Sequence, residues 1–212
     1  MSIGIIGAGG LGANVARALA KKGISATISN RRGPASLASL IEEVGPSIKA
    51  GTVLEAASAD IVLLAVRWVD VNKVLSGLPA WNGRIVIDGT NPVEFLDPNA
   101  PKDPSNPLAA YGIKAIDLGG KPSSVVVRDL LPGARVVKAL NHLDVSVLTQ
   151  TEVSGGTRVQ FYSGDDADAK AEVRRLLESA GYFAVDLGSL AVGGALAQLP
   201  FGPLAAINFI KI

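Results

Sequence analysis

The N-terminal stretch SIGIIGAGGLG, residues 2–12, decides the fold. Its first half, residues 2–6, is an apolar run that predicts a β-strand. Residues 11–22 then repeat apolar side chains at the spacing of an amphipathic helix. Between them, Gly7-Ala8-Gly9-Gly10-Leu11-Gly12 matches the pattern G-x-G-x-x-G. This pattern is informative here because it follows a predicted strand and begins a predicted helix.

Each glycine of this loop has a physical reason in a protein that binds a dinucleotide. Gly7 permits a tight turn, Gly9 lets the backbone approach a pyrophosphate, and Gly12 lets the helix pack closely on the strand. The free N–H groups and the positive dipole end of the helix then favour the phosphates. We therefore predict that this loop, with Gly10 and Leu11, binds a dinucleotide; a tight turn without a ligand is the alternative.

The rest of the chain alternates between short apolar runs and amphipathic stretches. Further strands are expected at residues 24–29, 48–50, 61–66, 85–88, 135–140, 158–163 and 183–186. Further helices are expected at residues 34–44, at 70–78, after a cap at Ser123 or Ser124, at 144–148, and from a cap at Asp165 or Asp166 to Ala180. This order predicts an α/β fold with a Rossmann-type, doubly wound, mostly parallel sheet. We expect one domain, with a core of residues 1–143 and an extension, residues 144–212, packed on it.

Residues 91–107 interrupt this pattern with five prolines. Proline removes a backbone donor and fixes φ, so neither a helix nor a central strand is expected there. The segment is then either a surface connection or a loop that covers a substrate site.

Composition excludes several classes of function. Twenty basic and nineteen acidic residues nearly cancel, so no surface for nucleic acid is expected. The absence of cysteine excludes disulfides, thiolate metal sites and cysteine nucleophiles. Residues 1–7 have the pattern of a strand and not of a signal peptide, and no apolar run approaches the ~18 residues of a membrane span. We therefore expect a cytoplasmic protein that binds neither nucleic acid nor a membrane.

The end of the second predicted strand indicates which dinucleotide is bound. An NAD-binding protein usually places Asp or Glu there, hydrogen-bonded to the ribose hydroxyls. This chain has Asn30, Arg31 and Arg32 instead. Guanidinium groups suit a 2′-phosphate, which an acidic side chain would repel. We predict NADP(H) as the cofactor; the alternative is that the two arginines are ordinary solvated charges.

Three other strand ends are candidates for the nicotinamide side of the site, because ligands of such sheets lie outside the carboxyl ends of the strands. They are residues 65–68, 88–92 and 138–142. Asn91 and Asn141 are the best candidates for contacts near the ring, although Asn91-Pro92 also suits a simple turn. Asp88 is expected to be a structural hydrogen-bond acceptor. Trp68 either lines the pocket or packs beneath the next helix.

His142 is the one histidine of the chain. A general acid is conceivable at a strand end, but no neighbouring carboxylate is placed to orient the ring, so we expect a local structural role. One histidine cannot form a metal site, and no metal-binding cluster or nucleophilic triad is present. Hydride transfer between two bound rings needs positioning more than acid–base residues, which fits this set.

Taken together, these segments resemble the F420-dependent NADP reductases, a family that also includes the cytoplasmic domain of the STEAP metalloreductases. The resemblance runs through the whole chain, on residues 4–9, 29–32, 64–68, 88–92, 131–141 and 163–166. It implies a Rossmann-type domain with a small C-terminal part, often dimeric. It also implies NADP(H) held by the glycine loop and by a Ser-Arg pair, where this chain has Arg31-Arg32.

The resemblance further implies that the nicotinamide lies near three turns. Together with the residues between them, these give the expected cofactor contacts Ala65, Val66, Arg67, Trp68, Asn91, Pro92, Ala139 and Asn141. Three positions depart from the family pattern: Arg67 replaces Pro, Leu140 replaces Phe, and His142 replaces Thr. These departures lie where a second substrate would approach, so they leave the cofactor assignment intact and the acceptor open.

Three functions are consistent with these residues. The leading one is an NADP(H)-dependent oxidoreductase that exchanges a hydride with a deazaflavin or flavin such as F420, acting as a homodimer. The second is an NADPH-dependent reductase of a small carbonyl or imine compound, in which His142 or Tyr111 would donate the proton. The third is a non-catalytic module that senses NADP(H).

Overall fold

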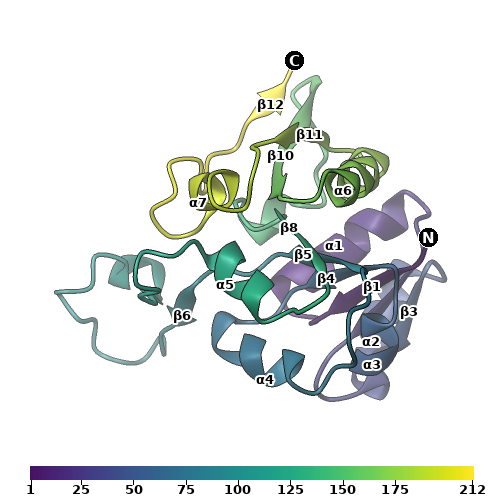
Figure 1. The fold of residues 1–212 in the computed structure, drawn as a ribbon, viewed down its shortest axis with the longest axis horizontal. Coiled ribbons are helices and arrows are strands. Elements are labelled where there is room, and N and C mark those ends of the chain that lie inside the picture. Colours follow the sequence, from purple (N-terminus) through teal and green to yellow (C-terminus); the bar gives the residue numbers. More distant parts are fainter.

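The computed structural model describes residues 1–212 and contains one large, mostly parallel sheet (Figure 1). Its strands follow the order β11-β10-β8-β5-β4-β1-β2-β3. Their bounds are β1 (Ile3–Ile6), β2 (Ala26–Ser29), β3 (Ile48–Gly51), β4 (Ile61–Leu64), β5 (Ile85–Asp88), β8 (Arg135–Ala139), β10 (Gly156–Gly164) and β11 (Phe183–Asp186). β1 to β5 and β8 are parallel, whereas β10 runs antiparallel to β8. The predicted Rossmann-type fold is confirmed.

Helices cover both faces of this sheet because the central strands are apolar on both sides. On one face, α1 (Gly10–Lys21), α2 (Ala38–Val44) and α6 (Ala167–Ser179) pack against side chains such as Ile5 and Leu63. On the other face, α3 (Val53–Ala57), α4 (Val71–Leu75) and α5 (Ser123–Asp129) pack against side chains such as Val62 and Leu64. No helix combines the length and the apolar character that crossing a membrane requires.

Local signals explain most helix boundaries, and two expectations need correction. Asp166 caps α6 through Ala169 N, as the sequence predicted. Ser123 and Ser124 do not cap α5: both are buried inside the helix, and its N-cap is Pro122. The short α3 was not expected, although Thr52 and Glu55 form a capping box that marks its start.

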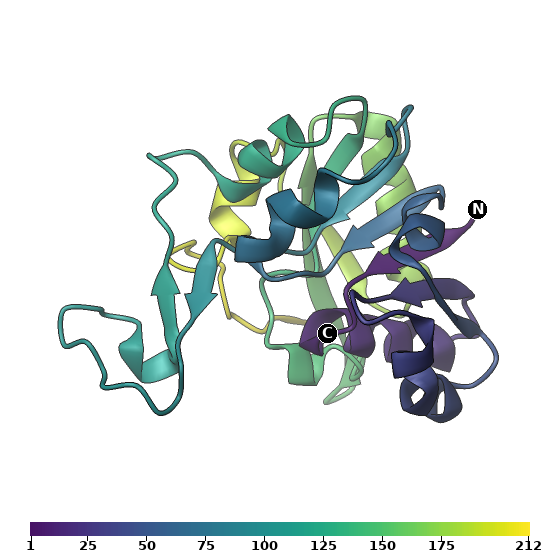
Figure 2. The same ribbon diagram turned by 90° about the horizontal axis from the view of Figure 1, so that it is seen from below.

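A hairpin arm, residues 93–115, projects from the body of the molecule (Figure 2). It consists of β6 (Val93–Phe95) and β7 (Ile113–Ala115), which pair antiparallel in a separate two-stranded sheet. The proline-rich segment was expected to exclude a helix and a central strand, and β6 is indeed peripheral. That it contributes a strand at all was not expected.

The C-terminal part extends the sheet on the β8 side. Two short strands, β9 (Glu152–Val153) and β12 (Ile210–Lys211), pair with β10. The short helix α7 (Gly193–Ala197) and the residues on either side of it pack against Val159 and Phe161 of β10. The segment 187–210 has no charged residue. Leu199 N of this segment donates a hydrogen bond to Asn91 Oδ1.

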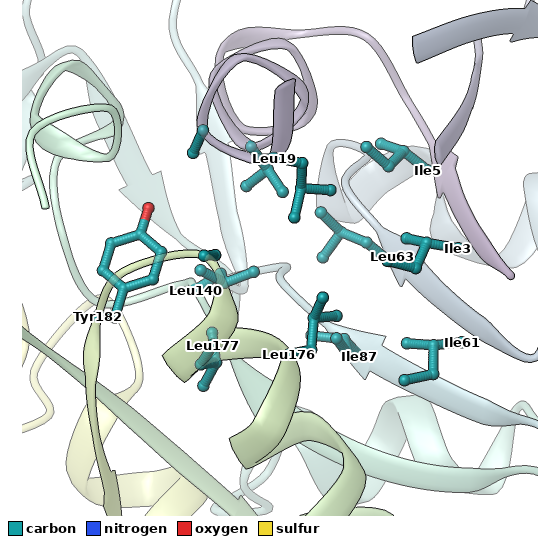
Figure 3. Close-up of a pocket in the computed structure, with 13 residues that line it drawn as sticks. Ile3, Ile5, Leu19, Ile61, Leu63, Ile87, Leu140, Leu176, Leu177 and Tyr182 are labelled. Carbon is teal, nitrogen blue, oxygen red and sulfur yellow. The ribbon is translucent and has the colours of Figure 1, made fainter. Parts of the chain in front are cut away.

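The core on the α1 side contains a small apolar cavity of about 20 Å³ (Figure 3). Leu19 of α1, Leu63 of β4 and Leu177 of α6 point toward it, and all thirteen lining residues are hydrophobic. A cavity of this kind stays dry and offers no group for chemistry. Leu140, which lines it, also lines a much larger cleft and adopts a positive φ of 64° at the end of β8.

Candidate functional site

An open cleft of about 560 Å³ lies at the carboxyl ends of β1, β4, β5 and β8. This is the edge of the sheet where ligands of doubly wound folds bind. Its lining residues come from every strand end that the sequence singled out except that of β2: Gly9, Gly10, Leu11, Ala65, Val66, Arg67, Trp68, Gly89, Thr90, Asn91, Val93, Phe95, Ile113, Leu140, Asn141, Leu143, Asp144, Val145 and Leu199.

The glycine loop joins β1 to α1 and is shaped by close contacts. A Cβ on Gly7, whose φ is +109°, would lie 2.2 Å from the carbonyl oxygen of Ala65, and a Cβ on Gly12 would lie 1.9 Å from that of Gly7. Both positions therefore exclude a side chain for packing reasons. Gly9 is different, because a Cβ there would meet nothing within 4 Å. Only a ligand, and not the protein itself, would need the space above Gly9.

The N-terminus of α1 is free to receive an anion. Gly9 is its N-cap, no side chain caps the helix, and its first turn contains no acidic residue. The uncapped N–H groups and the helix dipole at the start of this twelve-residue helix favour negative charge. Gly7 N donates to Ser29 O at 2.9 Å, which places this loop beside the end of β2.

The turn after β2 presents two unpaired cations. Asn30 Oδ1 accepts from Arg32 N at 2.9 Å, and Asn30 Nδ2 donates to Ser36 Oγ at 2.9 Å, so Asn30 shapes the turn. Arg31 and Arg32 are exposed, and neither forms an ion pair. The three residues lie beyond the cleft, at the neighbouring strand end.

Asn91 and Asn141 lie together at the opposite end of the cleft. Asn91 Nδ2 donates to Asn141 O at 2.8 Å, and Asn141 Nδ2 donates to Asn91 Oδ1 at 3.0 Å. Ala197 O and Leu199 N, from the C-terminal segment, bond to the same two amides. Asn141 Oδ1 is buried and has no hydrogen-bond donor. A buried acceptor without a donor costs free energy, so a donor from a ligand would be favourable there.

A buried ion pair supports this end of the cleft from below. Lys138 Nζ lies 3.0 Å from Asp88 Oδ2, and both side chains are excluded from solvent. Asp88 Oδ1 accepts from Thr90 N at 2.9 Å, while Lys138 also donates to Thr90 O and Ser123 Oγ. Burial lowers the pKa of Lys138, and the attraction of Asp88 opposes that change. The predicted structural role of Asp88 agrees with these contacts.

Arg67 and Trp68 follow β4 and line the cleft. The guanidinium of Arg67 lies 5.2 Å from the centre of the Phe95 ring, which comes from the hairpin arm. Trp68 lines the cleft and also packs partly against the core on the α4 side, so its two expected roles are both present.

Neither of the two proton donors that the carbonyl or imine alternative would need lines the cleft. His142 is fully buried, its ring centre lies 4.8 Å from that of Phe161 with the two rings tilted by 47°, and neither ring nitrogen has a hydrogen-bond partner. Burial lowers the pKa of His142 to about 4. Tyr111 is 78% exposed on the hairpin arm and does not line the cleft.

The residues that the sequence predicted to contact the cofactor, apart from Asn30, Arg31 and Arg32, fall into three groups. Nine of the expected contacts line the cleft: Gly9, Gly10, Leu11, Ala65, Val66, Arg67, Trp68, Asn91 and Asn141. Gly7 and Gly12 lie in the packed turn below it. Two expected contacts are elsewhere: Ala139 is fully buried in the core, and Pro92 lines a neighbouring hollow on the α7 side.

Sequence reasoning missed the apolar wall of the cleft. Val93, Phe95 and Ile113 come from the hairpin arm, and Leu199 comes from the uncharged C-terminal segment. The sequence V-E-F at residues 93–95 alternates as a strand does, which is the one local signal that could have identified the arm. It also missed Lys138, whose signal is a lysine that directly follows two valines within a buried strand.

Comparison with known proteins agrees with this architecture. A family model described as "NADP oxidoreductase coenzyme F420-dependent" matches residues 2–92. Metalloreductase STEAP3 of Rattus norvegicus is 26% identical over 200 residues. That match covers 93% of this chain but only 36% of the length of STEAP3.

Two solved structures are similar over nearly the whole chain. The hypothetical protein SMa0349 of Sinorhizobium meliloti is 39% identical, with a TM-score of 0.87 and coverage of 100% of this chain and 97% of the other. A candidate F420-dependent NADP reductase of Arthrobacter sp. FB24 is 27% identical, with a TM-score of 0.64 and coverage of 90% and 86%. Fold, strand-end motifs and family model agree, and residues 2–92 are similar to the NADP oxidoreductase family that is described as coenzyme F420-dependent.

Proposed function

We propose that the protein transfers a hydride between NADPH and a planar acceptor of the deazaflavin or flavin kind, such as F420. One observation carries this proposal: a single cleft begins at an open glycine loop, has an apolar wall, and is lined by Asn141, whose buried Oδ1 has no hydrogen-bond donor. A cofactor with phosphates at one end and a carboxamide at the other suits these groups.

The phosphate end of the cofactor would lie on the glycine loop. The space above Gly9 admits a pyrophosphate, and the uncapped start of α1 supplies N–H donors at Gly10 and Leu11. One strand further along the sheet, Arg31 and Arg32 would hold the 2′-phosphate, on a turn shaped by Asn30. Neither guanidinium has a carboxylate to release, so binding a phosphate costs no existing ion pair.

The nicotinamide end would lie against Ala65, Val66, Trp68 and Asn91. Bound NADPH supplies a hydride from its nicotinamide ring, and the oxidised ring remains after transfer. Asn141 Oδ1 would accept a hydrogen bond from the carboxamide, which fixes the rotation of the ring. The Asp88–Lys138 pair holds the turn that carries Asn91, so the amide is positioned before the cofactor arrives.

The ionisable groups of the cleft favour a ring acceptor. Arg67 and Asp144 are the two charged residues that line it. Asp144 Oδ1 already accepts from Ser146 N and Ser146 Oγ, and these bonds lower its pKa, so it is a poor proton donor. Reduction of a flavin or deazaflavin needs one hydride and one proton, and water can supply the proton to the exposed ring. The small carbonyl or imine alternative needs a donor in the cleft, and neither His142 nor Tyr111 is one of its lining residues.

We also propose that residues 1–143 hold the cofactor while residues 144–212 close the site, because Asp144, Val145 and Leu199 line the cleft from that part. The uncharged segment 187–210 is the proposed contact between two copies in a homodimer. Light scattering coupled to size exclusion measures the mass directly, and a monomer at assay concentration would contradict the dimer.

A mixing experiment tests the proposed reaction. Purified protein is combined with NADPH and, separately, with F420, FAD, FMN and a panel of carbonyl and imine compounds, and NADPH oxidation is followed by absorbance. We expect oxidation with a ring acceptor and a lower rate at subsaturating NADPH in the Gly9→Ala variant. Oxidation only by carbonyl or imine compounds would support the second function. Tight NADPH binding without any oxidation would support the sensing module.

A further inference from the structure

The guanidinium groups of this chain divide into two sets. Seven of the ten arginines direct the group at a carboxylate, carbonyl or amide oxygen. The remaining three, Arg31, Arg32 and Arg67, have no such oxygen, and all three follow the carboxyl ends of β2 and β4. These strands flank β1, so the unpaired cations lie on either side of the glycine loop.

Arg67 and the arginine pair follow different strands of the sheet. β1 separates the strand that precedes Arg67 from the strand that precedes Arg31 and Arg32. Neighbouring strands lie ~4.8 Å apart, so the two strand ends are separated by ~10 Å. In the proposed binding mode the 2′-phosphate is held by the pair on the β2 side and the pyrophosphate by the uncapped N–H groups of α1, so neither anion of the cofactor requires Arg67.

The surroundings of Arg67 fit the acceptor half of the cleft. Its guanidinium lies over the Phe95 ring, at a distance where a cation is attracted to the face of an aromatic ring. Phe95 also lines the cleft with Val93 and Ile113, which together form an apolar wall. A free cation next to an apolar wall suits a ligand that has a flat apolar part and an anionic part.

The one opposing charge in the cleft does not neutralise Arg67. Asp144 makes no ion pair with any cation, and its carboxylate is held by Ser146 at the start of a short 3₁₀ turn, residues 145–147. The cleft therefore keeps a net positive charge at the Arg67 side.

We propose that Arg67 binds a phosphate or carboxylate substituent of the hydride acceptor, so that the second substrate is a planar ring compound that carries an anion. This inference rests on the proposed function and deepens it. It assigns the side chain of Arg67 to the second substrate, while the backbone of residues 65–67 remains available to the cofactor.

Two flavins that differ only in a phosphate test this assignment. The protein is saturated with NADP⁺, and the dissociation constants of FMN and of riboflavin are measured by flavin fluorescence. We expect FMN to bind about tenfold more tightly than riboflavin, on the scale of a charged hydrogen bond. In Arg67→Met, FMN should bind as weakly as riboflavin, whereas riboflavin and NADPH should bind as in the wild type.

Lys73→Met is the matched control, because Lys73 is an exposed cation of α4 that neither lines the cleft nor forms an ion pair. It should keep the full preference for FMN. Equal binding of FMN and riboflavin by the wild type would overturn the assignment. So would an Arg67→Met variant that binds NADPH more weakly but keeps the preference for FMN. Failure of the proposed function is a separate result: NADPH would then not be oxidised by either flavin or by F420, whatever their relative affinities.

Discussion

Lys138 Nζ and Asp88 Oδ2 lie 3.0 Å apart between two neighbouring parallel strands, and solvent reaches neither side chain. The pair also holds the backbone of Thr90, since Asp88 accepts a hydrogen bond from Thr90 N and Lys138 donates one to Thr90 O. It therefore fixes the turn from which Asn91 reaches the cleft. Removing one partner would leave the other charge buried and unpaired.

Lys138→Met should therefore lower the free energy of unfolding by about 3–5 kcal/mol, as expected when a buried ion pair loses one partner. Urea denaturation measures this loss. The double variant Asp88→Asn with Lys138→Met should lose less than the sum of the two single variants, because no buried charge remains.

The exposed pair Arg174–Glu178 on α6 provides the control. Arg174→Met should change the free energy of unfolding by less than about 1 kcal/mol, because exposed pairs contribute little. Equal losses for Lys138→Met and Arg174→Met would contradict the structural role of the buried pair.

His142 should make stability depend on pH. Burial lowers its pKa from an ordinary 6.5 to about 4 in the folded protein, so the fold holds the neutral ring while the unfolded chain protonates first. Stability is then fully present above pH 6.5 and is lost as the pH falls from 6.5 toward 4. The loss from this one group is about 1.4 kcal/mol per pH unit within that window.

The measurement is urea denaturation at intervals across this window, for the wild type and for His142→Leu. The unfolding free energy of the wild type should fall relative to that of His142→Leu as the pH decreases, since Leu binds no proton. A difference that stays constant with pH would mean that the ring of His142 ionises equally in both states.

Gly9 and Gly12 should respond differently to the same substitution. A Cβ on Gly12 would lie 1.9 Å from Gly7 O, so Gly12→Ala should destabilise the fold by several kcal/mol, roughly as overpacking does. A Cβ on Gly9 meets nothing, and the φ of −78° at Gly9 suits alanine. Gly9→Ala should therefore keep the thermal midpoint and lose affinity for NADPH.

Calorimetric titration with NADPH and thermal denaturation of both variants provide the comparison. If Gly9→Ala bound NADPH as tightly as the wild type, the open space above Gly9 would not be the place of the pyrophosphate.

Sequence patterns predicted the sheet well because central strands such as β4 are continuous apolar runs. The strand from Ile61 to Leu64 is buried at every residue. The glycine loop was equally predictable, since Gly12 is fixed by its contact with Gly7 within one β-turn-α unit. Local chemistry thus determined these elements.

Contacts between distant segments could not be predicted in this way. The side chain of Asn91 bonds to Asn141, fifty residues away, and to Leu199, more than a hundred residues away. The wall formed by Val93 and Ile113 depends on an arm whose strands are separated by a proline-rich loop. No spacing along the chain encodes which face of that arm turns toward the cleft.

The preference for NADPH over NADH tests the account most directly. Dissociation constants for both cofactors are measured by calorimetry in the wild type and in the double variant Arg31→Ala with Arg32→Ala. Loss of two guanidinium groups from the 2′-phosphate should weaken NADPH binding by about 2–3 kcal/mol and leave NADH binding nearly unchanged. Equal weakening of both cofactors, or no change in either, would contradict the assignment of these arginines and of NADP(H).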